Sequence, residues 1–151
     1  MKILQPLFSP KNGISKKIPI SLVVERLKKH ERIKDVKIIK GTLSVLTKEI
    51  KYCGRNLGGY RITYNPNKHN HHVARIKGTV RGYNHPFISG DNCCFGNQAS
   101  VFNRAREDGD AHGVILMILE LLDCKTATVG SNPYISVTSF LRGLKRPNDW
   151  Y

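Results

Sequence analysis

The stretch that most restricts the fold is Gly113–Cys124, which reads GVILMILELLDC and is apolar on nearly every face. A helix of this composition has to be buried on most sides, and packing against a sheet buries it. The longest uninterrupted apolar run, Val114–Leu119, is far shorter than the ~18 residues needed to cross a bilayer. We therefore expect a core helix here and no membrane partner.

Four segments before this helix carry the β-branched and aromatic residues typical of strands. They are Val36–Ile39, Thr42–Ile50, Tyr60–Tyr64 and Val73–Val80. Turn-forming residues separate them at Gly41, in the GRNLGG run at 54–59 and in Asn65-Pro66-Asn67. Short connections of this kind predict an antiparallel meander of three or four strands.

The chain before the meander begins with an arm and then a helix. Residues 1–17 contain two prolines, a glycine and a pair of lysines, and they form the predicted basic arm. Ile20, Val23, Val24 and Leu27 then recur at helical spacing. We predict an α+β fold with an N-terminal helix, a four-stranded antiparallel meander, a cysteine loop and a buried C-terminal helix, all in one domain spanning 18–151. A last short helix is expected at Val137–Leu144.

The positive charge is unevenly distributed along the chain. The net charge of the 151 residues is +14, and residues 1–80 hold 18 Lys and Arg against 4 Asp and Glu. Residues 81–151 hold seven of each kind. A basic first half is compatible with a nucleic-acid partner or an acidic protein partner, although no groove-reading motif accompanies the charge.

The four cysteines do not have the density of a disulfide framework. They are Cys53, Cys93, Cys94 and Cys124. The N-terminus lacks the long apolar region of a signal peptide. We expect reduced thiols and a cytoplasmic location.

Histidines His69, His71 and His72 precede His85 and the cysteine doublet, which raises the question of a metal site. A structural zinc site needs four ligands in tetrahedral array, and no Cys-x-x-Cys pair is present. Alternation along an extended segment also separates His72 from the other two histidines of its run. The prediction is no metal.

The most unusual short stretch is HPFISGDNCCFGN at 85–97, in which two adjacent cysteines lie in a turn-rich loop. If the segment is extended, Cys93 and Cys94 point to opposite sides. One would then pack as a small apolar residue while the other faces solvent, where a thiolate could act as a nucleophile.

Several pieces of the chain, in order, resemble the ubiquitin-conjugating enzyme superfamily, including its bacterial and phage-borne relatives. The resemblance covers about residues 18–135. Its pieces are Asn56–Tyr64 (NLGGYRITY), Tyr64-Asn-Pro66, Val73–Ile76, His85-Pro86, Asn92–Gly96 (NCCFG), Val114–Leu122 and Ser131–Tyr134 (SNPY).

The resemblance implies a transferase with no cofactor that carries a modifier as a cysteine thioester. Cys94 aligns with the family nucleophile, and the family histidine, here His85, holds the turn together with Pro86 rather than acting as a base. The family asparagine that supports the loop and the oxyanion is Phe87 in this chain. Asn84, Asn92 or Asn97 could supply an amide in its place, or backbone N–H groups could suffice.

The partners implied are a ubiquitin-like modifier and an activating enzyme. Family members meet that enzyme through the N-terminal helix, where Arg26, Lys28 and Lys29 are the candidate partner-binding residues. Two alternatives stay open from the sequence. One is a non-catalytic module of the same fold that binds or assembles, and the other is a basic nucleic-acid-associated protein of a phage or plasmid.

Overall fold

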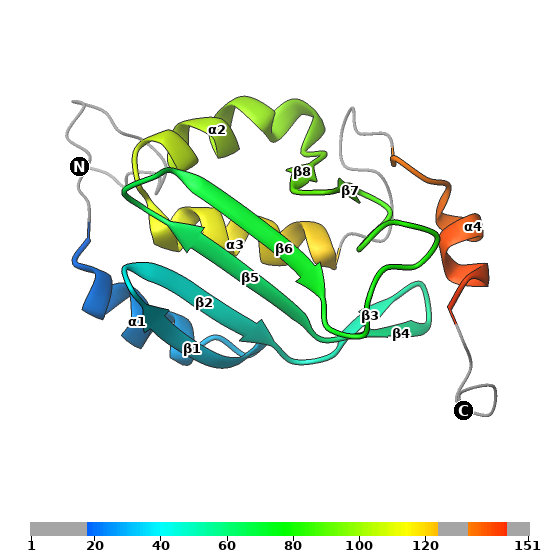
Figure 1. Cartoon of the computed structure of the whole chain (residues 1–151), viewed down its shortest axis with the longest axis horizontal. Helices are drawn as coiled ribbons and strands as arrows, with labels where there is room; N and C mark the ends of the chain where they lie inside the picture. The colour runs from blue at the N-terminus through cyan, green and yellow to red at the C-terminus, as the bar shows by residue number, and fades with distance from the viewer. Residues whose placement is uncertain (1–17, 124–132, 145–151) are drawn as a thin grey trace, which may run out of the picture.

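The computed structural model describes residues 18–123 and 133–144, so the predicted arm at 1–17 lies outside the described residues. The main sheet has four antiparallel strands in the order β1-β2-β5-β6, as the predicted meander requires. These strands span Ile33–Ile39, Thr42–Thr47, Tyr60–Asn65 and Asn70–Arg75. The α+β layout predicted from the sequence is confirmed (Figure 1).

One face of the sheet forms the core. Val36 pairs with Val45, Val45 with Ile62, and Ile62 with Val73, and all four side chains are buried. Because side chains alternate along a strand, the residues between them point to the opposite face. Arg61 and Thr63 lie there, and Arg61 donates from Nη1 to Ser44 Oγ at 3.0 Å.

The helices pack on the apolar face of the sheet. Helix α3 (Ala111–Leu122) contacts β5 and has eight buried residues, as expected for its composition. Helix α1 (Ile20–Lys28) packs on β1 through Val23 and Leu27. Figure 1 shows α3 running behind β5 and β6, and among the described elements no helix crosses the front of the sheet. None of the described helices is long and apolar enough to cross a membrane.

The sequence did not predict helix α2 (Ala99–Glu107), which packs along α3. Only Phe102 and Ala105 are buried on it, so its apolar stripe is too thin to stand out from the polar residues around it. Strand β5 holds its C-terminal end, because the Tyr64 hydroxyl donates to the carbonyl of Arg106 at 2.6 Å.

Several predicted boundaries were wrong in the strands. The segment Thr42–Ile50 is not one strand, because β2 ends at Thr47 and β3 (Ile50–Tyr52) pairs with β4 (Arg55–Gly58) in a separate hairpin. The GRNLGG run therefore contains a strand rather than only a break. Strand β6 begins at Asn70 and ends at Arg75. His71 and His72, which precede the predicted strand Val73–Val80, therefore belong to β6. The last helix, α4, spans Val137–Arg142 and ends two residues before the predicted boundary.

Candidate functional site

The His85-Pro86 turn is anchored by buried hydrogen bonds. The imidazole of His85 is fully buried, its Nε2–H donates to the carbonyl of Leu122 at 3.0 Å, and its Nδ1 accepts from the Phe87 N–H at 3.1 Å. Burial lowers the pKa of His85 to about 4, against a smaller opposing effect of the bond to Leu122. The ring is therefore neutral near pH 7, and its contacts are those of a residue that shapes the turn.

Asn84 connects the same turn to the sheet. Its Oδ1 accepts from the Arg75 N–H at 2.9 Å, and its Nδ2 donates to the carbonyl of Val73 at 3.2 Å. Its own carbonyl accepts from the Tyr60 hydroxyl at 2.5 Å. The amide of Asn84 is thus used to hold the turn on β6.

The cysteines lie on a short hairpin that follows the turn. Strands β7 (Ile88–Ser89) and β8 (Asn92–Cys93) pair through Ile88 and Cys93, and Gly90 takes a left-handed conformation (φ 62°) at the bend. This conformation costs glycine little, because glycine has no Cβ.

The two sulfurs have different surroundings. Cys94 follows the hairpin, and its N–H donates to the carbonyl of Phe87 at 2.9 Å. The Cys93 thiol donates to the carbonyl of Asp91 at 3.8 Å. Burial, the Asp91 carboxylate and Cys94 together raise the pKa of Cys93 to about 12, which disfavours its thiolate. Both cysteines are half-buried against the core, so the division into one inner and one outer thiol is less sharp than the sequence indicated.

Two of the histidines weighed as metal ligands instead hold the hairpin against β6. His72 Nδ1 contacts Asp91 Oδ1 at 2.5 Å, and His71 Nε2 donates to the Asp91 carbonyl at 2.6 Å. His69 lies elsewhere, with its Nδ1 contacting the Arg106 carbonyl at 3.2 Å. Within the described ranges, no group of three or more His, Cys, Asp or Glu side chains is arranged to hold a metal ion. Sequence reasoning missed the role of Asp91.

The predicted amide donors are placed differently from one another. Phe87 is buried and offers no side-chain donor. Asn92 is exposed on β8, and Asn97 is exposed in the short 3-10 helix η2 (Gly96–Gln98) that follows the cysteines.

Pro86 is buried, and its carbonyl accepts from the Tyr134 N–H at 2.8 Å. The SNPY motif alone did not indicate this contact between Tyr134 and the His85-Pro86 turn.

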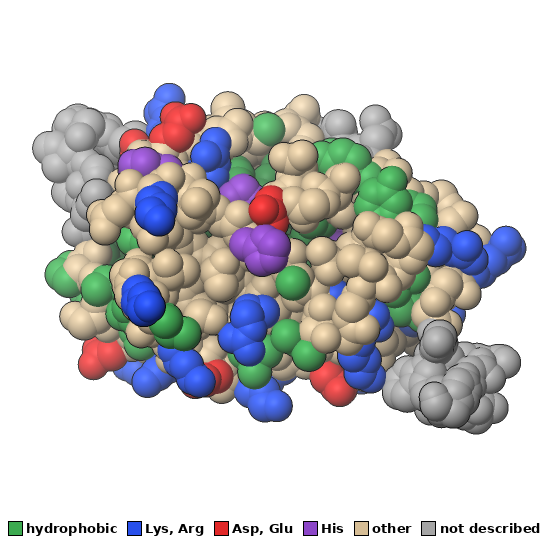
Figure 2. Space-filling model, viewed as in Figure 1, with side chains coloured by type: hydrophobic (Ala, Val, Ile, Leu, Met, Phe, Trp, Pro, Cys, Tyr) green, Lys and Arg blue, Asp and Glu red, His purple; other side chains and the backbone are tan. Residues whose placement is uncertain are grey.

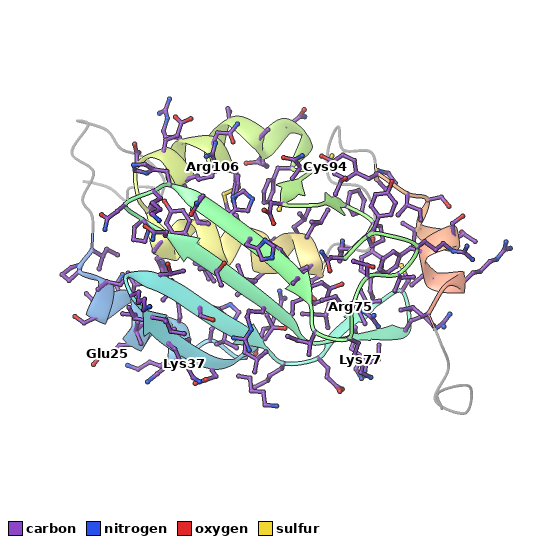
Figure 3. All side chains as sticks on the ribbon, in the orientation of Figure 1. Glu25, Lys37, Arg75, Lys77, Cys94 and Arg106 are labelled. Carbon is purple, nitrogen blue, oxygen red and sulfur yellow. The ribbon has the colours of Figure 1, made fainter. Side chains whose placement is uncertain are left out.

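The candidate partner-binding residues lie far along the chain from the cysteines. Arg26 and Lys28 are exposed on α1, and Lys29 is exposed at the C-terminal cap of that helix. Figure 3 shows Glu25 of α1 at the lower left and Cys94 near the top centre of the view. Lys and Arg side chains are spread in separate groups over the face shown in Figure 2, without one continuous basic stripe.

Comparisons of the chain with models of protein families, with curated proteins and with solved structures found no match.

Proposed function

We propose that this chain carries a ubiquitin-like modifier as a thioester on Cys94 and transfers it to an amine. The observation that carries the proposal is the pairing of a rigid turn with a partly accessible cysteine. His85 and Asn84 fix the turn by buried and half-buried hydrogen bonds, and Cys94 is attached to that turn through the carbonyl of Phe87. A preorganised backbone that leaves the sulfur partly exposed suits a thiolate that first attacks a thioester and then carries an acyl group that an amine must reach.

The proposed chemistry has two acyl transfers. In the first, the Cys94 thiolate attacks the thioester carbonyl of the charged activating enzyme, a new C–S bond forms, and the donor sulfur leaves as a thiolate. In the second, an amine attacks the carbonyl on Cys94, a C–N bond forms, the C–S bond breaks, and the amine proton passes to solvent. No net oxidation or reduction occurs in either step, so the reaction requires no cofactor.

The contrast between the two thiols favours Cys94 over its neighbour. Only a thiolate attacks a thioester effectively, and the raised pKa of Cys93 keeps that thiol protonated near neutral pH. Cys93 also lies inside the β7–β8 pairing, where its backbone is held opposite Ile88. In the proposed mechanism Cys93 only packs against the core.

The buried Phe87 favours a second candidate function, a non-catalytic module of the same architecture. Removing one oxyanion donor in other enzymes costs ~10²–10³ in rate. A binding module would need neither the donor nor the sulfur. It would keep its partner affinity when both Cys93 and Cys94 are replaced by alanine.

The exposed basic residues of α1 are the proposed contact for an acidic surface of the activating enzyme. Arg26, Lys28 and Lys29 form a group that charge reversal would disrupt without touching the core. If the charge instead serves a nucleic acid, binding will weaken steeply as salt rises, because phosphate binding releases counterions.

The proposal can be tested with a defined chemical donor. The wild-type chain is mixed with a glycylglycine thioester of 2-mercaptoethanesulfonate, and adducts are located by peptide mass spectrometry. We expect an adduct on Cys94 that excess thiol removes, which is lost in Cys94→Ala and kept in Cys93→Ala.

The chain carries an exposed second cysteine that serves as an internal reference for Cys94. Cys53 is exposed at the turn between β3 and β4, outside the cysteine hairpin. We expect Cys94 to pass its acyl group to an added amine at least ~10-fold faster than Cys53, because preorganisation lowers the barrier. Equal rates at the two sulfurs would refute the proposed function.

A further inference from the structure

Residues 133 and 134 bring the chain back to the turn that carries the cysteine hairpin. The Tyr134 N–H donates to the carbonyl of Pro86 at 2.8 Å, and Pro86 is one residue from Phe87, whose carbonyl holds Cys94. The Tyr134 side chain nevertheless remains 44% exposed, although most aromatic side chains of the described residues are buried. Its backbone is fixed at the site while its ring is left accessible.

The two cysteines also influence the titration of the Tyr134 phenol. Partial burial raises the pKa of Tyr134, and negative charge on Cys94 and then on Cys93 raises it further. The backbone bond to Pro86 fixes Tyr134 next to the turn that holds Cys94, and the electrostatic influence of the two cysteines agrees with that position.

An acyl group on Cys94 would need a donor for its carbonyl oxygen. That oxygen gains negative charge when a nucleophile attacks, and an oriented donor stabilises the charge. The Cys94 N–H already donates to the Phe87 carbonyl. Both Oδ1 and Nδ2 of the Asn84 side chain are hydrogen-bonded to the backbone of β6. Phe87 itself has no donor, whereas a phenol has a strong one.

We propose that the Tyr134 hydroxyl donates a hydrogen bond to the carbonyl oxygen of an acyl group carried on Cys94. This inference rests on the proposed function and names a catalytic residue for it. The phenol keeps its proton throughout. The nucleophile forms its bond to the carbonyl carbon, the oxygen accepts more strongly from Tyr134 as it becomes anionic, and collapse expels the Cys94 thiolate.

The test compares Tyr134→Phe and Tyr134→Ala with the wild type, using the same glycylglycine thioester. Charging of Cys94 and its discharge to hydroxylamine are followed separately by mass spectrometry. We expect Tyr134→Phe to slow discharge by at least about 10-fold, and Tyr134→Ala to behave similarly, since both remove the hydroxyl donor. Tyr83→Phe is the matched control, because Tyr83 lies in the turn paired with Val80 and should discharge at the wild-type rate.

The outcomes separate this inference from the proposed function. Failure of wild-type Cys94 to form the thioester would overturn both. Normal charging with discharge by Tyr134→Phe within twofold of wild type would overturn the hydroxyl's role alone, even if Tyr134→Ala were slow. Alkylation of Cys94 by iodoacetamide at equal rates in Tyr134→Phe and wild type would show that the substitution has not disturbed the hairpin.

Discussion

The buried imidazole of His85 makes a quantitative prediction about stability and pH. Its pKa is about 4 in the folded protein, against 6.5 as the ordinary value. The unfolded chain therefore binds a proton between these two values that the folded protein does not. Because the folded pKa is depressed, the stabilisation is complete above about pH 6.5 and is lost as pH falls toward 4.

The size of the effect follows from the same two values. A shift from 6.5 to about 4 corresponds to roughly 3 kcal/mol of unfolding free energy lost on going from pH 7.5 to pH 4. About half of that loss, roughly 1.4 kcal/mol, occurs by pH 5.5. The loss is large compared with a typical domain stability of ~5–15 kcal/mol.

The variant His85→Gln isolates this contribution, because glutamine can still donate to the Leu122 carbonyl but does not titrate near neutral pH. At pH 7.5 we expect it to cost about 1–3 kcal/mol, since the Phe87 N–H loses its acceptor in a buried site. The cost should shrink as pH falls, and near pH 4 the variant should be as stable as the wild type or up to about 2 kcal/mol more stable.

The measurement is urea unfolding followed by circular dichroism at pH 7.5, 6.5, 5.5 and 4.5 for both proteins. The other histidines, including His71 and His112 with their own lowered pKa values, contribute to both curves and cancel in the difference. A difference between wild type and His85→Gln that stays constant across this range would refute the reasoning. It would mean that water reaches the ring and that the imidazole titrates as it does in the unfolded chain.

Two further predictions concern residues that the sequence did not single out for structure. Asp91→Ala removes the side-chain contact with His72, and because both side chains are about half-exposed the global cost should stay below about 1 kcal/mol, whereas amide hydrogen exchange at residues 88–93 should quicken. A global loss above about 2 kcal/mol by chemical denaturation would contradict this. Asp110→Ala removes the side chain that accepts from the Gly113 N–H at 3.0 Å and should cost about 1 kcal/mol in urea unfolding, while Asp108→Ala, which leaves that cap intact, should cost less.

The sequence predicted the fold best where one side-chain pattern was strong and continuous. The residues at 113–122 left no alternative to burial, and strands such as Tyr60–Asn65 alternate buried and exposed positions as the sheet requires. Helix α2 was missed because its buried surface is supplied by two residues, and its position depends on contacts with α3 and on Tyr64 from a distant strand. Such long-range contacts leave no periodic signal in the sequence.

In the candidate site, too, local motifs could be predicted from the sequence and long-range contacts could not. His85 was predicted to hold its turn through hydrogen bonds. That prediction came from the resemblance of the His-Pro pair to a family motif. Its partner at Leu122 and the contact of Pro86 with Tyr134 join segments separated by tens of residues, so no local pattern reveals them. Asp91 appeared to be an ordinary turn residue, and only the register of β6 brings His71 and His72 to it.

The turn at residues 84–86 has a consequence for the order in which the chain is made. Its consecutive residues bond to the earlier strands β5 and β6, to the last turn of α3 and to Tyr134. During synthesis the cysteine doublet emerges from the ribosome before residues 122 and 134 have emerged to brace it. The hairpin can acquire its final geometry only once nearly the whole domain has been translated, and a nascent or truncated chain would display these thiols without the support that orients them.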